Sequence, residues 1–129
     1  MKVIKTSTFN ATITIGLQKG YSDILYTKES FIEVIQSYQK ELITRKNTYL
    51  SACVLDCLIA LNNQLEPHVK IEFINYPKFP LEKDVFKSNV NSLGKFLMKK
   101  FQQNRIVIVY PDETLMFEIE DKIDFRINQ

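Results

Sequence analysis

The chain has 129 residues, of which 45% are hydrophobic and 25% charged, and its formal net charge is +2. These values are typical of one soluble globular domain that can bury a core, so we treat residues 1–129 as a single domain. The charge is too small to indicate a nucleic-acid polymer as partner, and the apolar runs are too short for a membrane span or a secretory leader. We therefore expect a cytoplasmic protein.

The first two predicted elements are a strand and a helix. From Phe9 to Leu17 apolar and polar residues alternate, which predicts a half-buried strand with threonines on its second face. A loop is expected over residues 18–26. Thr27 is placed to cap a helix that runs to about Thr44, and apolar residues recur along it at spacings of three and four, which predicts one buried face.

The next predicted elements form a β-hairpin. Residues 48–61 are β-prone and apolar on both faces, which favours a central strand covered on both sides. Asp56 breaks this pattern, and a paired carboxylate is the interpretation we favour. A hairpin-like loop over residues 62–68 precedes an alternating strand from Val69 to Ile74. His68, at the start of that strand, is expected at the surface.

The hexapeptide 75–80 is the most distinctive segment of the chain. Its two prolines make it stiff, because proline fixes its own φ and restricts the residue before it. An amide, a cation and two aromatic rings make the segment a candidate grip for a small ligand; these side chains belong to Asn75, Tyr76, Lys78 and Phe79.

The remainder of the chain predicts a helix and a second hairpin. Residues 82–103 carry an apolar stripe at helical spacing, and the basic bias of this region suits an anionic ligand. Strands are expected over residues 105–110 and 115–119. The tail, residues 120–129, could add an edge strand or contact another subunit.

Two polar residues of this region are further candidates for the ligand site. Asn89 could face the same pocket as Phe79. Arg105 lies in a sheet among apolar neighbours, so it requires an acid, a carbonyl or a phosphate as partner.

The predicted order is β-α-β-β-α-β-β. We expect an α+β fold, with a mostly antiparallel sheet and two amphipathic helices on one of its faces. The other face has many apolar residues and no predicted helix to cover it, which predicts a homo-oligomer.

Signs of catalysis are missing from the sequence. His68 is the single histidine, and no phosphate-binding loop, dinucleotide fingerprint or zinc motif is present. Cys53 and Cys57 lack partners at metal-ligand spacing, so we expect reduced thiols, no metal site and no cofactor. A binding protein is favoured over an enzyme. The alternatives are a small enzyme of tautomerase-like or phosphoesterase type, with Asp56, His68 or a carboxylate pair gathered in a pocket, and an oligomeric interaction subunit.

An ordered set of short segments resembles a known family. The segments are FNATITIGL at residues 9–17, Gly20-Tyr21, Glu66-Pro67, INYPKFP at residues 74–80, Arg105-Ile106-Val107 and PDETLM at residues 111–116. Together they resemble phage-encoded Thoeris anti-defence proteins of the first type. The resemblance spans roughly residues 9–118. It implies a non-catalytic sponge that sequesters cyclic ADP-ribose isomers made by bacterial TIR-domain proteins in the cytoplasm of the infected host.

The resemblance also implies an assembly and a site. Some members form dimers and hexamers and hold cyclic oligonucleotides at separate sites. The family's ligand residues fall on Phe79, which would stack on adenine, on Asn89, and on Arg105, which would bind the pyrophosphate. Lys78 would add charge at the mouth, and Asn75 or Tyr76 would shape the wall. A further family arginine should fall near Val54, where this chain has none.

Each of these assignments has a structural alternative. Phe79 could anchor its loop in the core, and Arg105 could pair with an acid of the tail.

Overall fold

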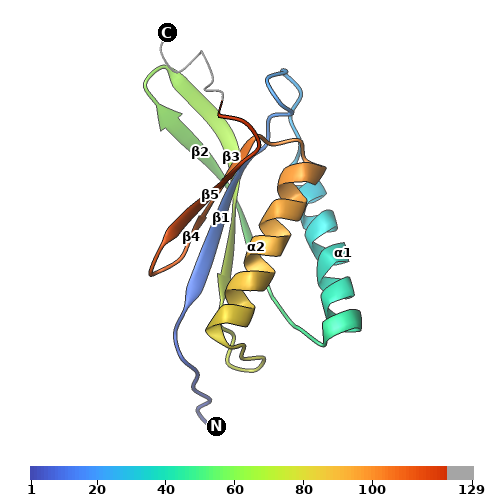
Figure 1. Ribbon diagram of the computed structural model, residues 1–129, viewed down its shortest axis with the longest axis vertical. Coiled ribbons are helices and arrows are strands. Elements are labelled where there is room, and N and C mark those ends of the chain that lie inside the picture. The colour runs from blue at the N-terminus through green and yellow to red at the C-terminus, as the bar shows by residue number, and fades with distance from the viewer. Residues whose placement is uncertain (122–129) are drawn as a thin grey trace.

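The computed structural model describes residues 1–121. Within them the chain forms an α+β domain with a single antiparallel sheet of strand order β2-β3-β1-β4-β5 and two helices on one side of it (Figure 1). The elements are β1 (Asn10–Gly16), α1 (Lys28–Lys46), β2 (Cys53–Leu61), β3 (Gln64–Ile74), α2 (Lys83–Lys100), β4 (Arg105–Val109) and β5 (Thr114–Glu118). The predicted class and element order are confirmed.

The core lies between the sheet and the helices. Alternate residues of the three inner strands point toward the helices and are almost fully buried, as their period of two requires. The helices contribute one apolar stripe each. The largest buried side chains are Ile13, Ile15, Phe31, Val69, Ile71, Phe73, Phe86, Val90, Leu93, Leu97, Ile106 and Ile108.

α2 lies close to the sheet at Gly94. A Cβ atom at this position would lie 2.9 Å from the Cδ1 atoms of both Ile106 and Ile108. Such distances are too short for carbon atoms in contact, so the helix can sit at this depth only because residue 94 has no side chain.

The prediction of a central strand over residues 48–61 is wrong. The strand begins only at Cys53, and in the described sheet β2 pairs with β3 alone, at the edge. Apolar residues on both faces do not mark a central strand here, because the β2–β3 hairpin continues past the ends of the helices (Figure 1). Leu58 is therefore 63% exposed and Leu61 55% exposed.

The predicted loop over residues 62–68 is also wrong. A two-residue turn, Asn62-Asn63, joins the strands, with Leu61 paired to Gln64 and Asn62 at a φ of 53°. Residues 64–68 already belong to β3. Pro67 is accommodated there because Leu17, the residue after β1, requires no donor from it. The N–H of Leu17 donates to the Pro67 carbonyl oxygen at 3.1 Å, and the carbonyl oxygen of Leu17 accepts from the Tyr26 N–H at 2.7 Å.

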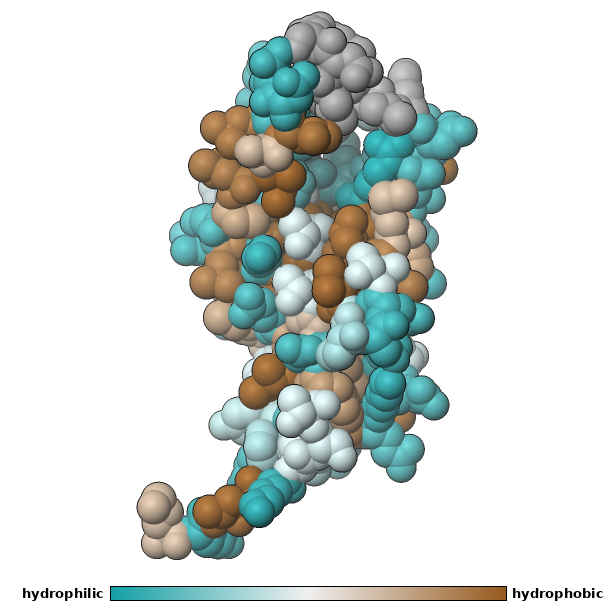
Figure 2. Space-filling model, turned by 90° about the vertical axis from the view of Figure 1, so that its left-hand side faces the viewer, coloured by the Kyte–Doolittle hydropathy of each residue, from teal (hydrophilic) through white to brown (hydrophobic). Residues whose placement is uncertain are grey.

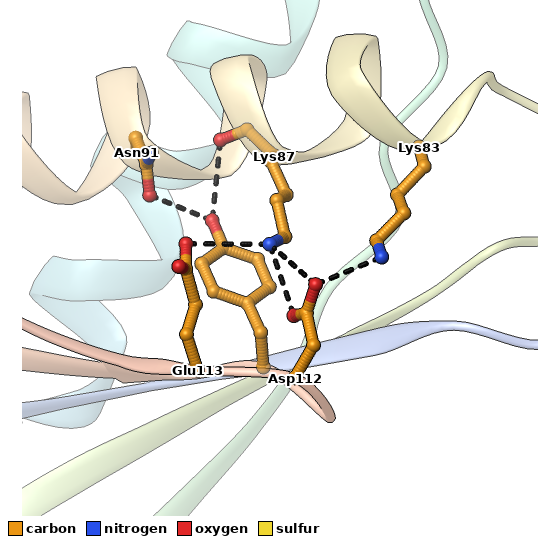
Figure 3. Close-up of polar contacts among 6 residues, drawn as sticks. Lys83, Lys87, Asn91, Asp112 and Glu113 are labelled. Atoms are coloured by element: carbon orange, nitrogen blue, oxygen red, sulfur yellow. Dashed lines mark hydrogen bonds and ion pairs between the residues drawn. The ribbon is translucent and has the colours of Figure 1, made fainter.

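A cluster of charged and polar side chains holds the β4–β5 turn against α2 (Figure 3). The ammonium groups of Lys83 and Lys87 lie 2.8 and 2.9 Å from the carboxylate oxygens of Asp112, and these contacts lower the pKa of Asp112 to about 2. Tyr110 donates a hydrogen bond to Oδ1 of Asn91 at 2.6 Å, and burial raises the pKa of its hydroxyl. These contacts join the β4–β5 hairpin of the sheet to α2.

The predicted start of α1 agrees with the structure. Thr27 caps the helix: its Oγ1 accepts from the N–H of Ser30 at 3.1 Å, and the Thr27 N–H donates to the Ser30 Oγ. Among residues 1–121 no helix has the length and apolar character that a bilayer crossing requires. The expected edge strand or subunit contact of the tail falls almost entirely beyond residue 121, outside the described residues.

Candidate functional site

The sheet has one face turned away from both helices, which we call the open face. Residues directly opposite each other on paired strands share a face, so the register places its side chains in rows. The residues of this face are Asn10, Thr12, Thr14, Gly16, Cys53, Leu55, Cys57, Ile59, Leu61, Gln64, Glu66, His68, Lys70, Glu72, Ile74, Arg105, Val107, Val109, Thr114, Met116 and Glu118. Figure 2 views the molecule from this side, where apolar side chains lie beside polar ones.

One row of the open face gathers chemically useful side chains. His68 pairs with Cys57 on one side and with Gly16 on the other, and Arg105 pairs with Glu118. The pairing of β1 with β4 places Gly16 level with Arg105. The imidazole of His68 and the guanidinium of Arg105 therefore lie on either side of β1, which has no side chain between them because residue 16 is glycine.

A cavity of about 580 Å³ opens at this row, a volume within the range of small-molecule sites. Its lining combines residues from the end of β1 and the loop after it, the start of β3, the connection from α2 to β4 and the segment after β5. These residues are Gly16, Gln18, Gly20, Tyr21, Glu66, Pro67, His68, Gln102, Gln103, Asn104, Arg105, Ile119 and Glu120. A Cβ atom on Gly16 would lie 2.7 Å from Oε1 of Gln103 and 3.6 Å from Nε2 of His68. Glycine at position 16 thus leaves room that any other residue would fill.

The side-chain amide of Gln103 is fixed in the cavity wall. Its Nε2 atom donates to the backbone carbonyl oxygens of Gln18 at 2.6 Å and of Phe101 at 2.9 Å. These two bonds tie the loop after β1 to the end of α2. They also turn the carbonyl oxygen of the amide toward Gly16.

The loop after β1 forms the rim of the cavity. The Lys19 N–H donates to the Ile24 carbonyl oxygen at 2.8 Å, and Gly20 turns the chain with a φ of 57°. This conformation favours glycine, because a Cβ atom is strained at positive φ. Tyr21, the next residue, is 51% exposed at the rim.

Charges of both signs line the cavity. Nε of Arg105 lies 2.5 Å from a carboxylate oxygen of Glu118. Glu66 accepts a hydrogen bond from the side chain of Gln64 at 2.7 Å, and Nδ1 of His68 lies 3.3 Å from the Glu66 carbonyl oxygen. A ligand that carries both an anionic and a cationic group would find a partner for each. Within residues 1–121 no group of three or more His, Cys, Asp or Glu side chains is placed to hold a metal ion.

The structure does not bring the predicted site residues together. Arg105 lies at the cavity, level with His68. The hexapeptide begins after Ile74, the last residue of β3, which is six residues and about 20 Å along the strand from His68. Phe79 is 43% exposed and stacks on Tyr49, with ring centroids 4.5 Å apart; its ring is also nearly parallel to that of Tyr76, at 6.0 Å. These three aromatic rings line a separate hollow of about 410 Å³.

The two predicted asparagines are buried and bonded to the backbone. Asn75 donates to the Ser7 carbonyl oxygen at 2.9 Å and accepts from the Leu81 N–H at 2.9 Å, so it holds the hexapeptide turn in place. Nδ2 of Asn89 donates to the Val85 carbonyl oxygen at 2.8 Å. Lys78 is exposed on the turn.

Asp56 and Arg105 both form ion pairs in the structure, as the structural alternatives to a role in ligand binding require. Asp56 lies 3.5 Å from the ammonium group of Lys28, which agrees with the pairing that we favoured. Arg105 does pair with an acid, Glu118 of β5, and its Nη2 atom also donates to the backbone carbonyl oxygen of Glu120, where the tail begins, at 3.4 Å.

Of the cavity residues to which we give a role, Gly16, Glu66 and Gln103 were not among the predicted site residues, and His68 entered only through the alternative of a small enzyme. Glu66 and His68 are two apart and so share a face of β3, but the interpretation of residues 62–68 as a loop hid this. Gly16 ends an alternating strand, and that glycine was the available signal for a close approach. No feature of the sequence around Gln103 indicates a site residue, because its position is fixed by the backbone carbonyl oxygens of Gln18 and Phe101, and Gln18 is close to it only in the folded chain.

Comparisons with known proteins give a structural match only. No family model matches the chain, and no curated protein matches it. The fold is similar to that of a phage SAM lyase solved in complex with S-methyl-5'-thioadenosine, with a TM-score of 0.71 and 22% identity over 95% of this chain and 98% of that chain. It is also similar to a phage SAM lyase in the apo state, with a TM-score of 0.67 and 22% identity over 89% and 92% of the two chains.

These matches correct the functional expectations drawn from the sequence. The resemblance to the Thoeris sponges is wrong, because the matching solved structures are those of a SAM lyase. The expectation of a non-catalytic sponge for cyclic ADP-ribose isomers is wrong with it, since the matching fold is that of an enzyme. The short segments on which the resemblance was based fall on strands and turns of the fold, and such local features can occur in the same order in several α+β proteins.

Proposed function

We propose that this protein binds S-adenosylmethionine in the cavity on the open face and cleaves it as a lyase, releasing S-methyl-5'-thioadenosine. The observation that carries the proposal is the similarity in fold to a phage SAM lyase, which extends over nearly the whole of both chains. That lyase was solved in complex with S-methyl-5'-thioadenosine. The alternative enzyme classes considered from the sequence required titratable groups gathered in one pocket. Glu66 and His68 meet this condition, whereas Asp56 does not line the cavity.

The reaction breaks the bond between the sulfonium sulfur and the γ-carbon of the methionyl group. The electron pair of that bond goes to sulfur, which becomes the neutral thioether of the product. The four-carbon fragment is completed without water in one of two ways. Its own carboxylate attacks the γ-carbon and closes a lactone, which needs no proton transfer, or a base removes a β-proton and leaves a vinyl group.

The residues of the cavity match the charges of this substrate. The guanidinium of Arg105 can hold the methionyl carboxylate through charge-assisted hydrogen bonds, in exchange for part of its contact with Glu118. The carboxylate of Glu66 suits the ammonium group or the sulfonium. Because the positive charge on sulfur disappears during the reaction, a carboxylate at the sulfur would stabilise the substrate more than the transition state, so we assign Glu66 to the ammonium group.

A homo-oligomer is the second part of the proposal. Leu55, Val109 and Met116 of the open face are 41%, 44% and 55% exposed, an unfavourable arrangement for apolar side chains on one sheet face. Lys70 and Glu72 give the same face charges of both signs. We propose that a second copy of the chain covers this apolar surface beside the cavity.

The direct test is to incubate the purified protein with S-adenosylmethionine and follow both nucleosides by liquid chromatography and mass spectrometry. We expect one equivalent of S-methyl-5'-thioadenosine for each substrate molecule consumed, and NMR of the four-carbon product separates the lactone from the vinyl route. Substrate that remains unchanged at high protein concentration would overturn the proposed function.

Replacement of Arg105 by alanine tests the site. Loss of a hydrogen bond to a charged group costs about 1.5–3 kcal/mol, so kcat/KM should fall about 10- to 100-fold. The matched control is Arg45→Ala, since Arg45 also pairs with a carboxylate, that of Glu41 at 2.8 Å, but lies on α1 away from the cavity. An equal loss of kcat/KM in both variants would remove Arg105 from the site.

A further inference from the structure

We propose that the side-chain carbonyl oxygen of Gln103 selects the base of the ligand, by accepting a hydrogen bond from the 6-amino group of adenine and rejecting 6-oxopurines. The inference rests on the proposed function, because it places an adenosyl group in the same cavity. It goes further by naming the protein atom that would read the base.

The orientation of the Gln103 amide carries the argument. A primary amide has two N–H hydrogens, and both have backbone acceptors here, the carbonyl oxygens of Gln18 and Phe101. A flip of the amide would place its oxygen against two carbonyl oxygens and lose both bonds. The amide therefore presents an acceptor to the cavity and cannot offer a donor in its place.

The position of the oxygen depends on Gly16. Oε1 lies 2.7 Å from the point where a Cβ atom of residue 16 would stand, and Gly16 and Gln103 both line the cavity. The backbone of β1 and the fixed amide thus form adjoining parts of one wall. Any side chain at position 16 would push the oxygen away from this place.

A fixed, uncharged acceptor favours one kind of ligand group. The 6-amino group of adenine is an uncharged donor, whereas the 6-oxo group of hypoxanthine would bring a second carbonyl oxygen against Oε1. The ammonium group of the ligand is better served by a carboxylate of the cavity, Glu66, than by an amide. Tyr21 at the rim and Pro67 in the lining supply apolar surface for a planar base.

The experiment compares S-methyl-5'-thioadenosine with S-methyl-5'-thioinosine by isothermal titration calorimetry. The two nucleosides differ in the 6-substituent and, as a consequence, at N1, which is an acceptor in adenine and carries a hydrogen in hypoxanthine. The inosine compound has no 6-amino group to donate a hydrogen bond to the fixed oxygen of Gln103. We therefore expect the wild type to bind the adenosine compound about 10- to 100-fold more tightly. In Gln103→Met this ratio should fall to within about threefold of unity. Gly16→Ala, which keeps the amide but displaces its oxygen, should also reduce the ratio.

The control is Gln39→Met, because Gln39 likewise donates from its amide to a backbone carbonyl, that of Leu50 at 2.8 Å, but at the other hollow of the molecule. It should leave the ratio unchanged. Equal binding of both nucleosides by the wild type, or an unchanged ratio in Gln103→Met and Gly16→Ala, would overturn the inference alone. Binding of neither nucleoside by the wild type would overturn the proposed function as well.

Discussion

At the scale of single residues, two glycines act through the space they leave empty. Gly16 leaves room at the cavity wall for the amide of Gln103, and Gly94 lets α2 lie close to β4. The sequence shows where the glycines stand but not what approaches them. The approaching side chains come from distant parts of the chain, so neither role could be predicted without the fold.

Gly94→Ala should lower the free energy of unfolding by up to about 2 kcal/mol. Alanine is the better helix former by roughly 1 kcal/mol, but the added Cβ atom would clash with Ile106 and Ile108, and overpacking of a core costs about 1–3 kcal/mol. Urea denaturation measures the change. Lys99→Ala, at an exposed position of the same helix, should remain within about 0.5 kcal/mol of the wild type. If Gly94→Ala were more stable than the wild type, the helix would have room to move outward.

At the scale of secondary-structure elements, the helices were predicted more accurately than the hairpins. A cap and a stripe at helical spacing are local signals, and both helices appear close to their expected bounds. Whether a strand is central or at an edge depends on its neighbours, and β2 was misplaced for that reason. The turn between β4 and β5 was predicted. Its ion pairs with α2, from Asp112 to Lys83 and Lys87, were not, because these residues are at least 25 positions apart in the sequence.

Asp112→Asn should make the protein less sensitive to acid. The pKa of Asp112 is lowered from 3.8 to about 2 by Lys83 and Lys87, so between these values the unfolded chain binds more protons than the folded one. Its stabilising contribution is therefore complete above about pH 4 and is lost as the pH falls toward 2. The measurement is the urea midpoint at pH 3 and pH 6.

The difference between the two midpoints should be smaller in Asp112→Asn than in the wild type. Asp23→Asn, an exposed carboxylate outside this cluster, serves as the control and should keep the wild-type difference. An unchanged difference in Asp112→Asn would mean that the two lysines do not stabilise the folded state through this carboxylate.

At the scale of the whole molecule, the fold class and element order could be predicted, but the site could not. Most strands showed an alternation of apolar and polar residues. The two predicted helices could cover only one face of the sheet, so the other face had no predicted cover. The row of Gly16, His68 and Arg105 exists only through the register between strands that lie far apart in the chain. The sequence motif that looked most like a ligand grip, around Phe79, lies at the opposite end of β3.

The exposed apolar side chains of the open face predict self-association. The wild type should elute above the 15.1 kDa of one chain when its mass is measured by light scattering during size-exclusion chromatography. Met116→Glu places a charge on the open face and should shift the mass toward the monomer. Ile43→Glu changes a comparably exposed residue of α1 and should leave the assembly intact. A wild type that elutes at 15.1 kDa would contradict the prediction.

The central position of β1 has a consequence for how the protein folds during synthesis. β1 is made before the other strands of the described sheet, whereas its partners β3 and β4 are made much later, and the pairing of Thr12 with Val109 joins residues 97 positions apart. Pairing over such separations slows folding, because the entropy of loop closure is lost before the contacts form. Until β4 emerges, Ile13 and Ile15 have no sheet to join on that side. We therefore expect the sheet to be completed only once β4 has been made, with the cavity among the last parts to form.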